Sequence, residues 1–146
     1  MAHLDEMDWQ LLALLQEDAR LGYRELARRV GLTPPAVATR VRRLESTGVI
    51  AGYHARVDPM KAGYGVEAFI HVASTGRRQS YTIAAHAAGD PLVLEDHRVA
   101  GQNDHVIRMV GTSISALEPF IDKLNENGRP TTSFVFSSPK RWSPVA

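Results

Sequence analysis

The segment Val30–Ile50 reads VGLTPPAVATRVRRLESTGVI, and it decides the fold of the first part of the chain. Pro34 and Pro35 stand side by side after Thr33. Threonine is a good helix cap, and proline is tolerated in the first helical turn because the N–H that it lacks would have no partner there. The pattern therefore predicts a helix that starts sharply at the prolines and continues to about Thr47.

The predicted helix has an apolar side and a polar side. At about 100° per residue, Val37, Val41 and Leu44 lie on one stripe. Four residues point the opposite way: Pro35, Thr39, Arg42 and Ser46. Arg43 lies beside this outer face, and Arg40 lies at its flank, nearer the core edge.

Two helices are predicted before it. The first runs from about Glu6 to Asp18 with Asp5 as its N-cap, and the second from about Tyr23 to Val30. Gly31 ends the second helix, because glycine adopts the left-handed conformation at low steric cost. A short helix joined to a second one by a tight glycine-containing turn is typical of a helix-turn-helix.

Positive charge is concentrated in this region. Between Arg20 and Arg43 the chain has seven arginines against one acid, Glu25, although its formal net charge is only +1. A charged run is often just a solvated helix face. Here the cations point outward from a sharply defined helix, where arginine can neutralise DNA phosphates and side chains near the helix start can reach base edges. The residues expected to contact DNA are Thr33, Pro35, Thr39, Arg40, Arg42, Arg43, Arg28 and Arg29, with phosphate contacts expected from Arg40 and from Arg28 or Arg29.

The chain beyond this helix predicts a domain boundary. Val49–Val57 favours a short strand or wing, and the residues from Pro59 to Gly65 (PMKAGYG) are typical of a linker. We therefore expect a helix-turn-helix DNA-binding domain at residues 1–60 and a second domain at residues 61–146.

The second half alternates between strand and helix patterns. Strands are expected at Val66–Ser74, at LVLEDHRVA (92–100), at HVIRMVG (105–111) and at about Thr131–Ser137. A helix is expected at about residues 78–88, with inward residues Tyr81, Ala84, Ala85 and Ala88. Another is expected after Ser115, whose spacing to Glu118 matches a capping box, and it should end near Gly128.

This order of strands and helices predicts a ferredoxin-like βαββαβ domain. Its four strands would form one antiparallel sheet, with both helices on one face. The fold class of the whole chain is therefore expected to be α+β, with a winged helix-turn-helix followed by this domain.

Several classes of site and protein are disfavoured. The absence of cysteine excludes disulfides, thiolate metal sites and cysteine nucleophiles. The apolar run LLALL is too short for a signal peptide or a membrane span, so a cytoplasmic protein with no membrane partner is expected. As a DNA-binding protein it is expected to be nucleoid-associated. The six histidines form no close i, i+4 pair, and no P-loop or G-x-S-x-G occurs, so we expect no metal, no cofactor and no enzymatic activity.

The residues resemble those of the Lrp/AsnC family, also called feast/famine regulatory proteins. The resemblance rests on LDEMDWQLLALLQEDAR, ELARRVGLTPPAVATRVRRLESTGVIAGY and VAGQNDH, and it covers about residues 4 to 141. The run RVRRLE at Arg40–Glu45, followed by G-x-I and GY, is its most specific part. The resemblance implies a DNA-binding domain and a ferredoxin-like regulatory domain that forms homodimers, assembles into tetramers or octamers, and often binds an amino acid between dimers.

Dimers are also expected on physical grounds. Each domain is small, and a sheet with helices on one face leaves its other face uncovered. A two-fold protein also matches the pseudo-palindromic sites that helix-turn-helix proteins read. A monomer with a polar open face is the alternative.

The resemblance also implies an effector site. In the family, the turn between the second and third regulatory strands resembles G-x-aromatic-D and helps to hold the ligand. Gly101 and Asp104 match, but Gln102 and Asn103 replace the middle of the motif, and the aromatic residue is absent. The implied effector contacts are Gly101, Gln102, Asn103 and Asp104, and Thr132 is expected to face the same cleft. The alternative is that GQND is only a hairpin turn, because Gly, Asn and Asp are common turn residues.

These patterns favour a sequence-specific DNA-binding transcriptional regulator that responds to an amino acid bound between dimers. Two alternatives remain open. One is an effector-independent architectural DNA-binding protein. The other is a small-molecule-binding ferredoxin-like module that does not bind DNA.

Overall fold

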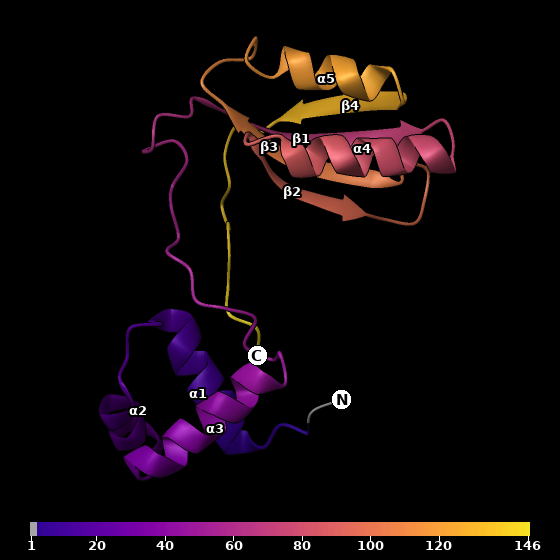
Figure 1. The fold of residues 1–146 in the computed structure, drawn as a ribbon. Coiled ribbons are helices and arrows are strands. Elements are labelled where there is room, and N and C mark those ends of the chain that lie inside the picture. Colours follow the sequence, from indigo (N-terminus) through magenta and orange to yellow (C-terminus); the bar gives the residue numbers. More distant parts are fainter. Residues whose placement is uncertain (1–2) are drawn as a thin grey trace. The chain divides into compact units, whose positions relative to one another are not determined.

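A computed structural model of the chain describes residues 3–146 and divides into two compact units (Figure 1). The helical unit extends to Arg56 and includes Lys140–Ala146, and the sheet unit is Val57–Pro139. The sequence placed the boundary near residue 60 and put the last residues with the second domain.

The helical unit contains α1 (Glu6–Glu17), α2 (Tyr23–Val30) and α3 (Pro34–Ser46). These bounds confirm the three predicted helices to within one residue. The apolar faces of the three helices share one core of buried residues, which are Leu11, Leu15, Leu26, Ala27, Val30, Val37 and Val41. Burying such side chains holds short helices together that would be marginal alone.

The predicted helix ends are also confirmed. Asp5 caps α1 and forms a capping box with Asp8, in which each side chain accepts a hydrogen bond from the other residue's backbone N–H. The Thr33 hydroxyl accepts a hydrogen bond from the backbone N–H of Ala36 at the start of α3. Gly31 follows α2 with a φ of 71°, which favours glycine.

The strand expected at Val49–Val57 is wrong. No strand forms between α3 and the first strand of the sheet unit, because the extended chain there has no neighbouring strand to pair with. Tyr53 instead directs its ring toward α1 and α3, and its hydroxyl donates a hydrogen bond to Glu45 Oε1 at 2.9 Å. A side-chain contact therefore takes the place of the expected wing strand.

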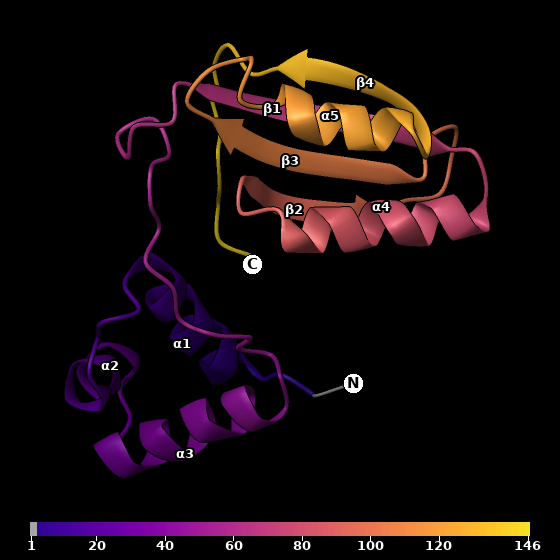
Figure 2. The same cartoon turned by 45° about the horizontal axis from the view of Figure 1, so that its top comes forward.

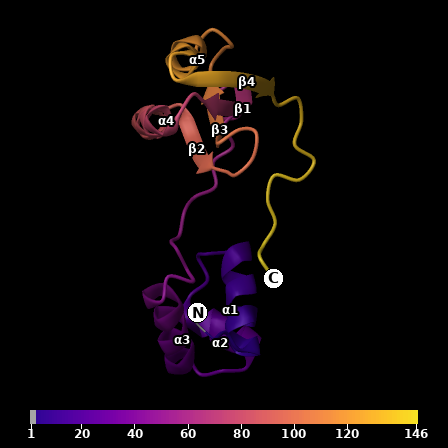
Figure 3. The ribbon, with the colours of Figure 1, turned by 90° about the vertical axis from the view of Figure 1, so that its right-hand side faces the viewer.

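The sheet unit has the expected βαββαβ order. Its elements are β1 (Val66–Ser74), α4 (Arg77–Gly89), β2 (Val93–Arg98), β3 (His105–Gly111), α5 (Glu118–Asn125) and β4 (Gly128–Phe134). The strands lie in the order β2-β3-β1-β4, and every neighbouring pair is antiparallel (Figure 2). Both helices lie on the same face of the sheet (Figure 3). The α+β class and the ferredoxin-like topology are confirmed.

The two faces of the sheet differ in character. The face covered by α4 and α5 carries the core: Ala68, Ile70, Val72, Ile83, Ala87, Ile107, Met109, Leu117, Phe120 and Leu124. The alternate residues point to the face without helices. We call this the open face, and it includes Phe69, His71, Val106, Arg108, Thr131 and Ser133.

The residues of α4 that were predicted to face the core are wrong, because the buried residues lie about one position earlier in the sequence. The residues of α4 that are buried against the sheet are Ser80, Ile83 and Ala87. Tyr81 is 53% exposed, and its ring lies 5.8 Å from the guanidinium carbon of Arg77 and 5.4 Å from that of Arg98. Cation–π contacts therefore hold the tyrosine outside the core.

The ends of α5 and β4 also differ from expectation. The capping box at Ser115 and Glu118 is wrong, because α5 begins at Glu118 without a side-chain cap and the Ser115 hydroxyl lies 3.0 Å from that of Ser113. Gly128, expected as a helix terminator, is the first residue of β4. A Cβ atom there would lie 2.8 Å from the Ala73 carbonyl oxygen, so this close strand contact requires glycine.

Among residues 3–146, no helix combines the length and the apolar character that crossing a bilayer requires.

Candidate nucleic-acid interface and ligand turn

The outer face of α3 has the orientation that the sequence predicted. Val37, Val41 and Leu44 are buried in the helical unit. The residues predicted to contact DNA that are exposed on α3 and its cap are Thr33, Pro35, Thr39, Arg42 and Arg43, whereas Arg40 is half-buried. The structure thus exposes one side of α3, with its capped N-terminus and a cationic C-terminal half.

Two of the three arginines on α3 form ion pairs with carboxylates at the start of α1, on its cap residue Asp5 and on Asp8. Nη1 of Arg40 lies 2.7 Å from Asp5 Oδ2 and 2.9 Å from Asp8 Oδ1. Nη2 of Arg43 pairs with Asp8 Oδ2. The side chain of Asp8 is fully buried, while 46% of the Asp5 side chain is exposed. The capping box of α1 is therefore also the anchor for two arginines of α3.

These contacts keep both carboxyl groups charged. The hydrogen bond from Arg40 is the main cause that lowers the pKa of Asp5. Burial alone would raise the pKa of Asp8, but hydrogen bonds from the Asp5 backbone, Arg43 and Arg40 outweigh it, so that this pKa is lowered as well. The hydrogen bonds that Arg40 donates to Asp5, first, and to Asp8 raise the pKa of Arg40. The ion pairs are thus present throughout the neutral range.

On α2, Arg28 and Arg29 share one acid. Arg28 donates two hydrogen bonds to Glu25, at 2.9 and 2.7 Å, and Arg29 donates one at 2.7 Å. The hydrogen bonds from Arg28 and then Arg29 lower the pKa of Glu25 to about 2. All three side chains are at least one-third exposed, so the arginines can still turn toward a phosphate.

The remaining arginines of the cationic region are Arg20, Arg24 and Arg42. In the part of the chain that the structure describes, no ion pair involves the side chain of Arg20, Arg24 or Arg42. Arg42 is the one among these three that lies on α3. Counting charges between residues 20 and 43 missed the acids of α1, and the only sequence signal for them was that Asp8 follows the cap residue Asp5 by one helical turn.

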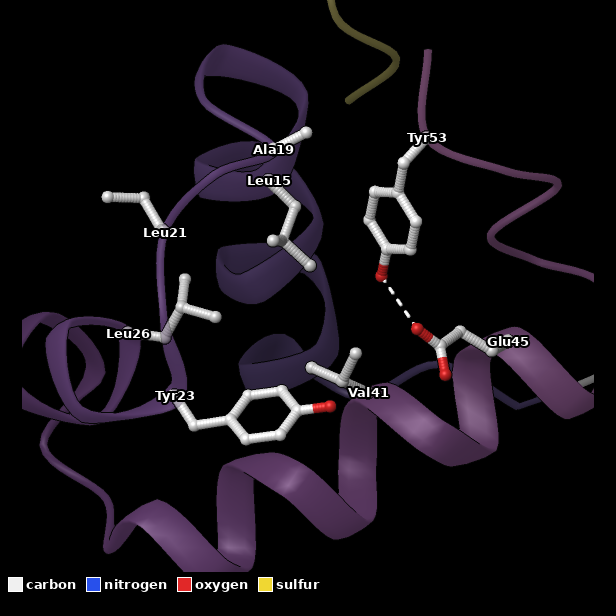
Figure 4. Close-up of a pocket in the computed structure, with 8 residues that line it drawn as sticks. All are labelled: Leu15, Ala19, Leu21, Tyr23, Leu26, Val41, Glu45 and Tyr53. Carbon is white, nitrogen blue, oxygen red and sulfur yellow. Dashed lines mark hydrogen bonds between the residues drawn. The ribbon is translucent and has the colours of Figure 1, made fainter.

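A small pocket lies on another side of the helical unit (Figure 4). Its volume is about 200 Å³, and its lining consists of Leu15, Ala19, Leu21, Tyr23, Leu26, Val41, Glu45 and Tyr53. Burial, with the hydrogen bond to Glu45, raises the pKa of Tyr53 to about 12. The hydroxyl therefore stays a donor, and the Tyr53–Glu45 contact holds the chain after α3 against the helices.

In the sheet unit, the turn between β2 and β3 contains the residues predicted to bind an effector. Gly101 has a φ of 147°, and the backbone N–H of Asp104 donates to the Val72 carbonyl at 3.0 Å. The Asp104 carboxylate accepts hydrogen bonds from the Ser74 backbone N–H at 2.8 Å and the Ser74 hydroxyl at 2.6 Å. Its side chain is 32% exposed. The turn thus presents a partly exposed carboxylate of fixed orientation.

Hydrogen bonds keep this carboxylate ionised. Burial would raise the pKa of Asp104, but the hydrogen bonds from Ser74 and from the Ser80 hydroxyl lower it to about 2. A carboxylate that stays charged can attract a ligand ammonium group.

The structure does not bring Thr132 to this turn within one chain. Thr132 lies on β4, opposite Ile70 of β1. The turn joins β2 to β3, which lies on the other side of β1. A ligand that touched both Asp104 and Thr132 of the same chain would have to reach across β1.

A buried histidine next to the turn was missed by the sequence analysis. His105 is fully buried, with Nε2 lying 2.8 Å from the Ser80 hydroxyl and Nδ1 lying 2.9 Å from Asp96 Oδ1. The order of hydroxyl, imidazole and carboxylate is that of a nucleophilic triad, but Ser80 is only 2% exposed, so no substrate can approach it. These three residues instead connect α4, β2 and β3 beside the turn.

Two family models match the chain. The AsnC-type helix-turn-helix domain matches residues 4–45, which include all three helices of the helical unit except the end of α3. The Lrp/AsnC ligand binding domain matches residues 67–145, which include every helix and strand of the sheet unit except the first residue of β1.

Individual proteins are also similar to this chain, over most of its length. The HTH-type transcriptional regulator YezC of Bacillus subtilis is 41% identical over 135 residues, which are 92% of this chain and 95% of that protein. The leucine-responsive regulatory protein of Rhizobium meliloti is 36% identical over 120 residues, covering 81% of this chain and 77% of that protein. The structure of a transcriptional regulator from Neisseria meningitidis in complex with L-Met matches with a TM-score of 0.90 at 30% identity, covering 99% of this chain and 97% of that one.

Proposed function

Because the chain belongs to the Lrp/AsnC family of transcriptional regulators, we propose that it is a sequence-specific DNA-binding regulator whose assembly responds to an amino acid. The observation that carries the proposal is the exposed face of α3, where Arg42 stands without an acidic partner among residues 3–146. The protein would act in the cytoplasm, in association with the nucleoid.

The DNA part of the proposal uses α3 as the recognition helix. Side chains at the start of such a helix reach base edges in the major groove, and arginine binds guanine or phosphate oxygens. Thr33, Pro35 and Thr39 would lie along the groove, and Arg42 would make the arginine contact that needs no rearrangement. Arg28 and Arg29 of α2 would contact the backbone.

The effector part of the proposal uses the turn Gly101–Asp104. Asp104 presents a charged carboxylate for an ammonium group, and Gly101 leaves room for a ligand to approach the backbone. One relative is named a leucine-responsive regulatory protein, and a similar structure contains L-Met, which supports an amino acid as the ligand class. Thr132 would join the site from a second chain, because β1 separates it from the turn within one chain.

The assembly part of the proposal uses the open face of the sheet. Phe69 and Val106 are only partly buried there, and no helix among residues 3–146 covers them. Two open faces packed together would form a homodimer, and such dimers would associate further into tetramers or octamers. A dimer places two α3 helices on one duplex, as the symmetry of pseudo-palindromic sites requires.

The decisive test of DNA recognition is Arg42→Ala in the full chain. In vitro selection with the wild-type protein supplies a preferred duplex, and fluorescence anisotropy measures affinity for it and for a duplex of mixed sequence. If Arg42 makes a bidentate base contact, we expect the preferred duplex to lose about 1–3 kcal/mol and specificity to relax there. Tyr81→Ala, on the surface of the sheet unit, is the control. A wild-type chain that binds neither duplex would refute the proposal.

One observation favours the effector-independent architectural alternative. The Asp104 carboxylate already accepts two hydrogen bonds from Ser74, so this carboxylate has hydrogen-bond partners without a ligand. A thermal-shift screen of the twenty amino acids separates the two functions, because a ligand that binds only the folded state raises the unfolding temperature. A response that Asp104→Ala abolishes supports the effector site, and no response to any amino acid supports the architectural function.

A further inference from the structure

Acidic residues of α1 compete for the arginines that α3 would offer to DNA. We propose that Asp5 and Asp8 are specificity-determining residues, which hold Arg40 and Arg43 in internal ion pairs and thereby weaken binding to non-specific DNA. This inference rests on the proposed function. It changes the role of Arg40, which the sequence assigned to a phosphate contact.

The geometry makes the competition direct. A single nitrogen of Arg40, Nη1, donates to both oxygens of Asp5 and to Asp8 Oδ1, at 2.7–2.9 Å. A phosphate oxygen would take the same kind of charge-assisted hydrogen bond. Arg40 therefore cannot give this donor to DNA without leaving a carboxylate.

Asp5 and Asp8 differ in the free-energy cost of losing their arginine partners. Asp8 is fully buried, so removing its partners would leave an uncompensated charge inside the protein, which is strongly unfavourable. Asp5 has 46% of its side chain exposed, and water can replace a lost arginine there at little cost. Asp8 therefore tethers α3 to α1, while the contact between Asp5 and Arg40 is the one that exchanges.

The ion pairs weaken the attraction of Arg40 and Arg43 to DNA phosphates, whatever the base sequence. Two carboxylates and two guanidinium groups sum to zero charge, so Arg40 and Arg43 contribute little attraction until an ion pair opens. Non-specific binding depends almost entirely on phosphate neutralisation, whereas specific binding also gains contacts to base edges. In the specific complex, contacts to base edges hold α3 in the groove while the ion pairs stay closed. The acids then lower mainly the non-specific affinity, and the ratio of specific to non-specific affinity rises.

The test is Asp5→Ser in the full chain. Serine caps a helix about as well as aspartate, so α1 keeps its N-terminus while Arg40 loses its exchangeable partner. The matched control is Glu6→Gln, which removes the same formal charge from the next residue. Glu6 is exposed, and in the described part of the chain it forms no ion pair. Thermal unfolding establishes that both variants are folded, and Asp5→Asn, which also keeps the cap, replaces the serine variant if that one is unfolded.

Affinities for the preferred duplex and for a duplex of mixed sequence are measured over a range of salt concentrations. Freeing an exposed ion pair should raise the non-specific affinity of Asp5→Ser by up to about fivefold over wild type. One additional phosphate contact should steepen its slope of log affinity against log salt by about 0.9. The ratio of specific to non-specific affinity should fall. Glu6→Gln should change neither the slope nor the ratio.

Each other outcome overturns the inference. Equal effects of Asp5→Ser and Glu6→Gln would mean that only overall charge matters. A lower non-specific affinity in a folded Asp5→Ser variant would mean that the carboxylate supports DNA binding rather than competing with it. If the wild-type chain binds DNA and the variant matches it, the inference alone fails, whereas a wild-type chain that binds no duplex removes the proposed function too.

Discussion

Neighbouring arginines on one helix acquire different roles from the atoms that surround them. Arg40 and Arg43 form ion pairs with Asp5 and Asp8, which largely neutralise the charge of these two arginines. Arg42 is exposed, and among residues 3–146 no ion pair involves its side chain. The same reasoning applies to Asp104, whose carboxylate orientation and charge are set by Ser74 and Ser80.

The lowered pKa of Asp104 predicts a pH dependence of stability. This pKa is about 2 in the folded protein, compared with an ordinary value of 3.8. A group whose pKa is lowered by folding contributes stability above its unfolded pKa, and that stability is lost as the pH falls through the folded pKa. We expect the free energy of unfolding of the sheet unit to lose about 1–2 kcal/mol between about pH 4 and pH 2, less than the full shift because water screens the exposed third of the side chain.

Asp104→Asn provides the measurement. Urea unfolding of wild type and variant at a series of pH values should show a stability difference at pH 6 that shrinks toward pH 2. Asp122→Asn, an exposed carboxylate of α5 with no hydrogen bond to its side chain in the described residues, is the control. A stability difference that does not change with pH would contradict the role given to the Asp104 charge.

At the scale of elements, the ends of the helices determine how the helical unit is built. Asp5, Gly31 and Thr33 each stand at a helix end and satisfy a local requirement of the backbone. These requirements place α2 and α3 a few residues apart, so that the apolar face of α3 packs in the core and its opposite face is exposed. The helix-turn-helix therefore depends on a small number of residues in its turn.

Gly31→Ala should destabilise the helical unit. Its φ of 71° lies in the left-handed region, where an L-residue costs about 1–2 kcal/mol. Thermal unfolding followed by circular dichroism measures this loss of stability. Gly22→Ser is the matched control, because Gly22 precedes the same helix at a φ of −76° and has no side-chain cap. We expect the serine to be neutral or to stabilise by only a few tenths of a kcal/mol; equal losses in both variants would show that the left-handed φ is not the cause.

At the scale of the whole molecule, the chain combines a unit suited to DNA with a unit suited to assembly. The sheet unit buries its core under α4 and α5 and leaves the open face without a helix. An open face that contains Phe69 and Val106 favours a second copy of the chain as its cover. The function proposed for α3 then depends on this pairing, because one recognition helix contacts few base pairs.

Phe69→Glu tests the pairing. In a dimer joined through the open faces, this change would bury an unpaired carboxylate, at a cost of about 3–5 kcal/mol and hence at least about a 100-fold weaker dimer. Sedimentation velocity should show a shift to monomer at concentrations where wild type is dimeric. Ala85→Glu introduces the same side chain at an exposed position of α4 and should leave the dimer intact. Unchanged assembly in Phe69→Glu would place the dimer contact elsewhere.

Local sequence signals were sufficient for most of the fold. The limits of α1, α2 and α3, the order of strands and helices along the sheet unit and the exposed side of α3 all follow from capping residues and hydrophobic periodicity, which act between residues a few positions apart. The errors also have local causes. The strand expected at Val49–Val57 had no partner to pair with, and the capping-box pattern at Ser115 did not correspond to a helix start.

The sequence by itself determined the two kinds of domain, the cationic composition of the helix-turn-helix and the turn Gly101–Asp104. Only the tertiary structure decided which of those cations are free, because Arg40 and Arg43 meet acids that lie 32 to 35 positions away along the chain. Only it placed Ser80 and Asp96 around His105, and Thr132 across β1 from the turn. Ion pairs and buried hydrogen bonds depend on distances of a few ångströms between remote segments, and those distances exist only after the chain has packed.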